Sequence, residues 1–221
     1  QAADGDIYYP DYSRLVLVIP AQVCTIGGYS IVGKKTFSTN DGPADMSYAV
    51  VGALYASHLY TVGHELGHSF GNGGHANAFH NCREKIDWHH CDHEEYGDRY
   101  DLMGAYGSKY HFNAAHKEHL GWFKPENITT VEASGRFTLA PIETPSADRQ
   151  TLKIPRGQHD FLFAEYRQPV GFDAIWPGQE NIYSGALLHT LEYADDPSAS
   201  ALIDAAPEDN FVLTVPVGSS F

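Results

Sequence analysis

The stretch "GHELGHSFGNGGHAN", residues 63–77, contains three histidines, one glutamate and five glycines. The segment that leads into it has apolar residues at steps of three and four, which is the period of an amphipathic helix. These residues are Leu59, Val62, Leu66 and Phe70. Gly71 follows at once, and glycine commonly ends a helix in left-handed geometry. The pattern therefore predicts a helix that carries the first two histidines and stops at Gly71.

The spacing of His64 and His68 is typical of a metal site. Residues four apart lie on the same face of a helix, so both imidazoles can bind one ion. Glu65 lies roughly 100° round the helix from His64, which makes it a poor co-ligand but lets it reach a water on the metal. Zinc accepts imidazole ligands, and catalytic zinc sites combine three protein ligands with a water. The H-E-x-x-H arrangement thus predicts two zinc ligands and a general base, Glu65.

A resemblance to a known family follows from two motifs. "HELGHSFGNGGH" and the later "YGDRYDLMG" resemble the metzincin zinc metallopeptidases, whose pattern is H-E-x-x-H-x-x-G-x-x-H followed by a methionine turn beneath the zinc. Within that family, "EYGDRYDLMG" and "HFNAAHKEHLGW" are similar to the gametolysin group of secreted peptidases and its bacterial relatives. The resemblance covers about residues 13–123. It implies His64 and His68 as zinc ligands, Glu65 as the base and Met103 as the floor of the site.

The third zinc ligand departs from the family pattern. That pattern places it at position 74, which is Gly74 here, and His75 comes one residue later. Glycine adopts backbone angles that other residues avoid, so Gly73 and Gly74 would let the extra residue loop out and bring His75 to the metal. Other histidines are rivals for this role, although a structural imidazole bonded to a carbonyl is the usual alternative. The rivals are His80, His89, His90, His93 and His111.

Two further features lie near the methionine turn. Tyr106 follows Met103 by three residues, and the resemblance offers it as an oxyanion-binding group, with packing in the turn as the alternative. The acidic stretch "CDHEEYGDRYD", residues 91–101, carries oxygen ligands that could hold Ca²⁺. Alternatively, Asp98 or Asp101 hydrogen-bonds the turn or a ligand histidine.

The chain has three cysteines. Cys82 and Cys91 enclose a short loop, so we expect them to form a disulfide, which implies an oxidising compartment and a secreted protein. The alternative is a metal site that uses both sulfurs and nearby histidines. Cys24 is left over, as a buried thiol or as the partner of a segment that precedes Gln1. A chain that begins at Gln1 without a signal peptide is expected to be processed or cut from a longer one.

The predicted fold class is α+β. Residues 1–123 would form a metzincin-type catalytic domain, with a mixed sheet, the active-site helix and the methionine turn. Only 63 residues precede His64, so we expect the front part of this domain to be truncated. Residues 13–20 and 27–37 are predicted strands, the second an exposed edge guarded by lysines or, by the resemblance, pairing with substrate. Residues 124–221 are predicted to form a β-rich antiparallel, sandwich-like domain.

Composition limits the partners. A net charge of −14 and a pI near 5.2 argue against nucleic acid. No apolar run reaches the length of about 18 residues that a membrane span needs. We therefore expect a secreted zinc endopeptidase that acts on extracellular proteins or peptides, with no prediction of oligomeric state. The alternative is a catalytically silent zinc-containing module that binds protein or glycan through its β-rich half.

Overall fold

The computed structural model of the protein describes residues 5–23, 25–82, 90–157, 160–175, 180–193, 196–205 and 214–216. The fold is α+β, with mixed sheets and few helices, as the sequence predicts at this level. The chain forms two compact units, Gln1–Gly73 and Gly74–Phe221. Within the described residues, no helix is long and apolar enough to cross a membrane.

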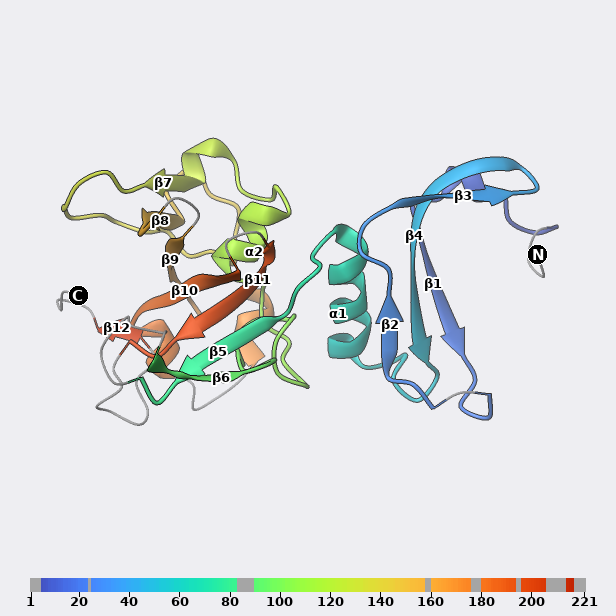
Figure 1. The fold of residues 1–221 in the computed structure, drawn as a ribbon, viewed down its shortest axis with the longest axis horizontal. Helices are drawn as coiled ribbons and strands as arrows, with labels where there is room; N and C mark the ends of the chain where they lie inside the picture. The colour runs from blue at the N-terminus through green and yellow to red at the C-terminus, as the bar shows by residue number, and fades with distance from the viewer. Residues whose placement is uncertain are drawn as a thin grey trace. The chain divides into compact units, whose positions relative to one another are not determined.

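The first unit is a small mixed sheet that packs against one helix (Figure 1). Its central strand β4 (Gly42–Gly52) pairs in parallel with β1 (Arg14–Ile19) and antiparallel with β2 (Gly28–Ser30) and β3 (Lys35–Thr39). Helix α1 (Leu59–Phe70) contacts β4 and β2. A short 3-10 helix, η1 (Tyr9–Asp11), precedes the sheet.

The predicted strand over residues 27–37 is two strands, β2 and β3. Gly33 separates them with a φ of 63°, a value that glycine tolerates better than other residues. Its N–H donates to the carbonyl of His68 at 2.9 Å, so the break is tied to the last turn of α1. Lys34 and Lys35 are both exposed beside it.

The second unit is built on one large sheet with the order β6-β5-β11-β10-β9-β8-β7, and β12 pairs with β10 (Figure 1). The strands are β5 (Ala76–His80), β6 (Asp92–Glu94), β7 (Ile128–Thr130), β8 (Thr151–Pro155), β9 (Phe161–Tyr166), β10 (Gly185–Tyr193), β11 (Asp196–Ile203) and β12 (Thr214–Pro216). The helices of this unit are short: α2 (Ala114–His119), η3 (Pro125–Asn127), η4 (Gly171–Ile175) and η5 (Glu180–Tyr183).

Most strand pairs within residues 124–221 are antiparallel, as the sequence predicts, but the sheet as a whole is not. β5 runs parallel to β11, and β7 runs parallel to β8, so the sheet is mixed. Strands β5 and β6 precede residue 124, yet they share the sheet with strands that follow it. Turn composition indicated the strands themselves, but it carries no information on the direction in which distant strands pair.

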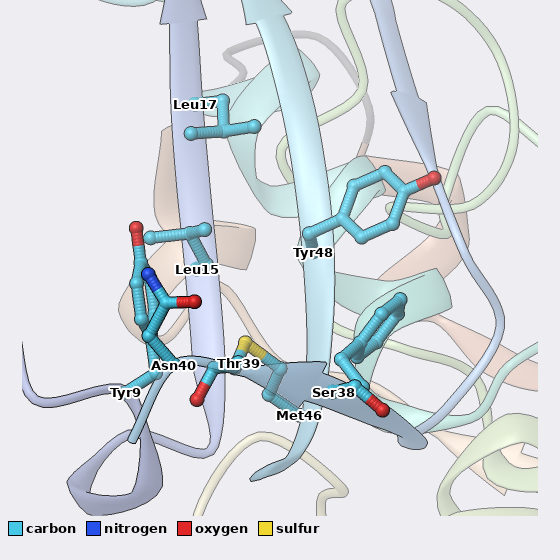
Figure 2. A pocket seen from close by; sticks show the side chains of 9 residues that line it. Tyr9, Leu15, Leu17, Ser38, Thr39, Asn40, Met46 and Tyr48 are labelled. Atoms are coloured by element: carbon cyan, nitrogen blue, oxygen red, sulfur yellow. The ribbon is translucent and has the colours of Figure 1, made fainter. Parts of the chain in front are cut away.

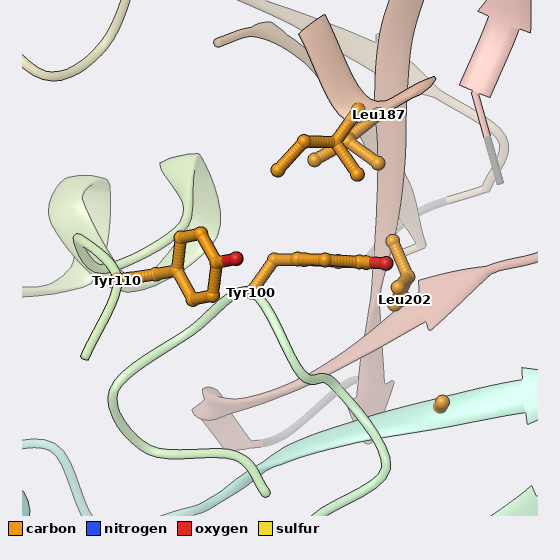
Figure 3. Packing of buried hydrophobic residues seen from close by; sticks show 6 residues of the cluster. Tyr100, Tyr110, Leu187 and Leu202 are labelled. Atoms are coloured by element: carbon orange, nitrogen blue, oxygen red, sulfur yellow. The ribbon is translucent and has the colours of Figure 1, made fainter. Parts of the chain in front are cut away.

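Apolar side chains cover both faces of this sheet, since the adjacent residues Leu187 and Leu188 belong to different clusters. Tyr100 and Tyr110 are buried with their rings nearly perpendicular, at 78°, beside Leu187 and Leu202 (Figure 3). Both tyrosines come from the loop segment that precedes α2, and both leucines come from the sheet. The loops between β6 and α2 are therefore anchored to the sheet by large aromatic groups.

Buried charged side chains form a network of ion pairs and hydrogen bonds in the second unit. Arg167 is fully buried and donates to Glu165 Oε1 at 2.7 Å, to Asp173 Oδ2 at 3.0 Å and to the carbonyl of Tyr100 at 2.8 Å. His189 is buried on the same network, with Nε2 3.0 Å from Asp98 Oδ2. Buried charges of this kind stay stable only while their partners remain in place, so the network holds the loops around Tyr100 to the sheet.

Lys117 on α2 provides a test of this packing. Its side chain is 9% exposed, and its ammonium donates to the carbonyl of Ile142. Burial, with a smaller contribution from the charge of Arg167, lowers the pKa of Lys117 from 10.5 to about 8. Between these two pH values the unfolded chain holds more protons than the folded chain, so this group makes stability rise with pH.

We predict that the free energy of unfolding of the wild type rises between about pH 8 and 10.5, relative to Lys117→Met, by up to about 3 kcal/mol. Chemical denaturation at several pH values measures this difference. Lys124→Met, at an exposed position, is the control and should follow the wild type. A wild-type curve that runs parallel to that of Lys117→Met across this range would contradict the buried position of Lys117.

Candidate metal centre

Three histidines come together at the end of α1 and just after it. His64, His68 and His75 each offer one ring nitrogen, and these nitrogens all lie within 4.8 Å of one another. The group could hold a metal ion. Among the described residues, no other group of three or more His, Cys, Asp or Glu side chains could do so. These are the three histidines that the sequence analysis selected as ligands.

Helix α1 positions the first two ligands. The rings of His64 and His68 are one turn apart, with centroids 5.0 Å from each other and planes at 85°. His68 Nδ1 lies 2.7 Å from the carbonyl oxygen of Asn72, which can only accept, so Nδ1 carries the proton and the unprotonated Nε2 can bind a metal. Gly71 ends the helix at a φ of 127°, with its N–H donated to the His68 carbonyl, as predicted.

His75 is held by residues that lie about twenty positions further along the chain. Its Nδ1 is 3.3 Å from Glu95 Oε1, and its ring stacks on Tyr96 with centroids 3.9 Å apart. Sequence reasoning assigned Glu95 to a calcium-binding stretch and gave Tyr96 no role. Only the pairing of β5 with β6 brings these residues to His75, and residue spacing does not predict that pairing.

A close contact accounts for the glycine at position 74. A Cβ atom there would lie 2.6 Å from Ala199 Cα, and the Gly74 N–H donates to Ser198 Oγ at 2.8 Å. Any side chain, including the histidine of the family pattern, would collide with the backbone of β11. The predicted reason was different: Gly71, and neither Gly73 nor Gly74, has a positive φ in this segment.

Glu65 is buried on the same helix. It is 7% exposed and packs against β2, where a Cβ on Gly28 would lie 2.6 Å from Glu65 Cγ. Its Oε2 has no hydrogen-bond partner among the described residues. Burial raises the pKa of Glu65 from 4.5 to about 7, because an apolar setting disfavours the charged carboxylate. A nearby cation would lower that pKa again.

Two aspartates shape the methionine turn. Asp98 accepts the N–H of Tyr100 at 2.8 Å, and Asp101 accepts the N–H of Met103 at 2.6 Å. The prediction that these carboxylates hydrogen-bond the turn is confirmed. Met103 is fully buried, and its carbonyl accepts the N–H of Ala76 at 3.0 Å. The turn is thereby tied to the residue that follows His75, while the role of Met103 as the floor of a zinc site stays a prediction.

Asp101 also takes part in a serine–histidine–aspartate relay. His116 Nδ1 lies 3.0 Å from Asp101 Oδ2, and His116 Nε2 lies 3.1 Å from Ser200 Oγ. All three residues are fully buried, and Ser200 Oγ also accepts from Asn113 Nδ2 at 2.8 Å. A nucleophile without solvent exposure cannot meet a substrate, so this relay is part of the core and does not make the protein a serine hydrolase.

The remaining predicted residues have separate positions. Cys82 and Cys91 form the predicted disulfide, which leaves neither sulfur for a metal. Tyr106 is 72% exposed on the loop after Met103, where it lines a cavity of about 280 Å³, and its role as an oxyanion group stays a prediction. Cys24 and His89 lie outside the described residues.

Among the described residues, none of the rival histidines belongs to the three-histidine group. His111 Nδ1 lies 2.8 Å from Asp173 Oδ1, and His80 Nδ1 lies 4.0 Å from Glu94 Oε2. His90 precedes β6, and His93 lies within β6, where its ring is near that of Phe79. Within the described part of the chain, the acidic stretch of residues 91–101 forms no group of three ligands for Ca²⁺.

A cavity of about 330 Å³ in the first unit carries different chemistry (Figure 2). Side chains of β1, β3 and β4, together with η1 and the loop after β3, line it. They are Tyr9, Leu15, Leu17, Phe37, Ser38, Thr39, Asn40, Met46 and Tyr48. This lining includes no histidine and no carboxylate, so the cavity offers neither a metal site nor a general base.

Comparison with known proteins gives no match: no family model, no curated protein and no solved structure matches this chain. The features that point to a function are therefore the motifs and the geometry of the three-histidine group.

The contact at position 74 predicts the effect of a small substitution. Gly74→Ala should lower the free energy of unfolding by about 1–3 kcal/mol, because the added methyl overlaps the backbone at Ala199. Thermal or urea denaturation measures the change. Gly27→Ala is the matched control, since a Cβ at Gly27 meets nothing within 4 Å. Equal stability of the two variants would mean that Gly74 does not pack against β11.

Proposed function

We propose that the protein is a secreted zinc endopeptidase of the metzincin type. The observation that carries this proposal is the gathering of three imidazole nitrogens within 4.8 Å, next to a buried glutamate on the same helix. Among the described residues, Glu65 Oε2 has no hydrogen-bond partner, so it could act on a water bound at this group.

The donor set fits zinc. Three imidazoles are a ligand set of catalytic zinc sites, which keep a further position for water. His68 and His75 each direct Nδ1 to an oxygen acceptor, which favours the tautomer whose unprotonated Nε2 can bind the ion. Bound there, zinc would lower the pKa of a water molecule and polarise a scissile carbonyl.

Glu65 would move the proton. Its Oε2 has no partner among the described residues and can accept the proton of the attacking water. The same oxygen would then donate that proton to the leaving amine as the peptide bond breaks. No covalent intermediate is needed, which agrees with the burial of the Ser200 relay.

Strand β2 offers a place for the substrate backbone. It is an edge strand in the order β1-β4-β2, and it lies against α1, where Ser30 Oγ is 2.8 Å from Ser69 Oγ. Gly28 of this strand packs against Glu65. An extended peptide that adds to the free edge of β2 would gain main-chain hydrogen bonds close to the base. This arrangement supports an endopeptidase that binds internal segments of a protein or peptide chain.

The proposed location agrees with two findings. The Cys82–Cys91 disulfide is stable in an oxidising compartment. Among the described residues, the helices also include no candidate membrane span. The protein would therefore act on extracellular protein or peptide substrates.

Cleavage of casein or gelatin tests the proposal. The zinc-loaded chain should cleave, a chelator should abolish cleavage, and added zinc should restore it. Glu65→Gln should keep the metal but lower kcat by about 10²–10⁴-fold, since it removes the proton acceptor. Glu132→Gln, at an exposed position, is the control and should retain activity.

Two results would contradict the endopeptidase. A chain that binds one zinc per molecule but cleaves no member of a peptide library would instead be the silent binding module. Full activity of Glu65→Gln would show that Glu65 is not the general base.

A further inference from the structure

The pairing of β5 with β6 sets the surroundings of His75. His75 directly precedes β5, and Glu95 directly follows β6. The two strands are antiparallel, with Ala78 opposite Glu94, and the Cys82–Cys91 disulfide lies at the far end of the pair. In an antiparallel pair, a step backward along one strand is matched by a step forward along the other. The residues just before β5 therefore lie beside the residues just after β6.

Tyr96 adopts an unusual backbone conformation at this point. Its φ is 58°, in the left-handed region that non-glycine residues rarely adopt. The side chain of Asn77, which is buried, accepts the Tyr96 N–H at 2.8 Å. Gly97 then turns back with its N–H donated to the Glu94 carbonyl, and a Cβ at Gly97 would lie 2.7 Å from Ala78 Cβ. The turn is thus fixed by the Asn77 hydrogen bond, the Gly97 hydrogen bond and the close packing of Gly97 on Ala78.

Glu95 and Tyr96 contact the imidazole of His75 in complementary ways. Glu95 Oε1 is 3.3 Å from Nδ1, and a carboxylate oxygen accepts, so the contact favours the tautomer with the proton on Nδ1. The Tyr96 ring stacks on the imidazole with planes at 30°, which restricts rotation of the ring. In this tautomer Nε2 carries no proton, so its lone pair can bind an ion.

We propose that Glu95 and Tyr96 are positioning residues for the third metal ligand: Glu95 selects the tautomer of His75, and Tyr96 fixes the plane of its ring. This inference rests on the proposed metal centre and deepens it. Partners that orient a ligand histidine typically change metal affinity by about 10–100-fold when they are removed. The Glu95 side chain is 65% exposed, so we expect its effect at the low end of that range.

The zinc dissociation constant of the metal-free chain, measured by competition with a chromophoric chelator, tests the inference. Glu95→Ala should raise this constant about tenfold, and Glu95→Gln should recover most of the loss because its amide oxygen still accepts from Nδ1. Tyr96→Ala should also weaken binding, whereas Tyr96→Phe keeps the ring and should bind like the wild type. Glu94→Ala, one residue away and near His80, is the matched control.

Nitrogen NMR of the imidazoles measures the tautomer of His75 directly. This tautomer would not change if Glu95 had only a structural role. At pH 7.5, His75 in the metal-free wild type should show the Nδ1–H tautomer, and Glu95→Ala should shift it toward a mixture of tautomers. Zinc binding by Glu95→Ala and Tyr96→Ala within twofold of the wild type would overturn the inference while leaving the metal centre intact. A wild type that binds no zinc would overturn the metal centre and this inference together.

Discussion

The carboxylate of Asp101 joins several segments of the second unit through hydrogen bonds. One fully buried side chain accepts the N–H of Met103, the N–H of Asn113 and the Nδ1–H of His116. Burial alone would raise the pKa of Asp101, but the charge of His116 and these hydrogen bonds outweigh it and lower the pKa. The methionine turn, the start of α2 and, through Ser200, strand β11 are therefore joined at a single group.

That junction reaches the candidate metal centre through the main chain. The Met103 carbonyl holds the N–H of Ala76, and Gly74 packs on Ala199 of β11. His75 lies between Gly74 and Ala76 in the chain, and its imidazole contacts Glu95 and Tyr96. His64 and His68 need less support from distant residues, because one turn of α1 already places both imidazoles on one face.

Local sequence patterns therefore predicted the helical part of the site and little of its surroundings. The spacing of His64 and His68 and the stop at Gly71 both follow from rules that act within a few residues. The Cys82–Cys91 pair followed from its short loop. Each of these features depends on neighbours in the sequence.

The missed features depend on contacts between distant segments. Glu95 reaches His75 only because β5 pairs with β6, and the crowding at Gly74 arises from Ala199, more than a hundred residues away. Most strand pairs of the predicted extension are antiparallel, but the parallel pairing of β7 with β8 and of β5 with β11 has no local signature. The break at Gly33 is fixed by the carbonyl of His68, on a different element.

X-ray absorption at the zinc edge is the most direct test of the three-histidine centre. For the zinc-loaded wild type, the account predicts three imidazole nitrogens and one further light ligand at about 2.0 Å. His75→Ala should then show two imidazoles. A wild-type site with only two imidazoles, unchanged by the loss of His75, would contradict the account.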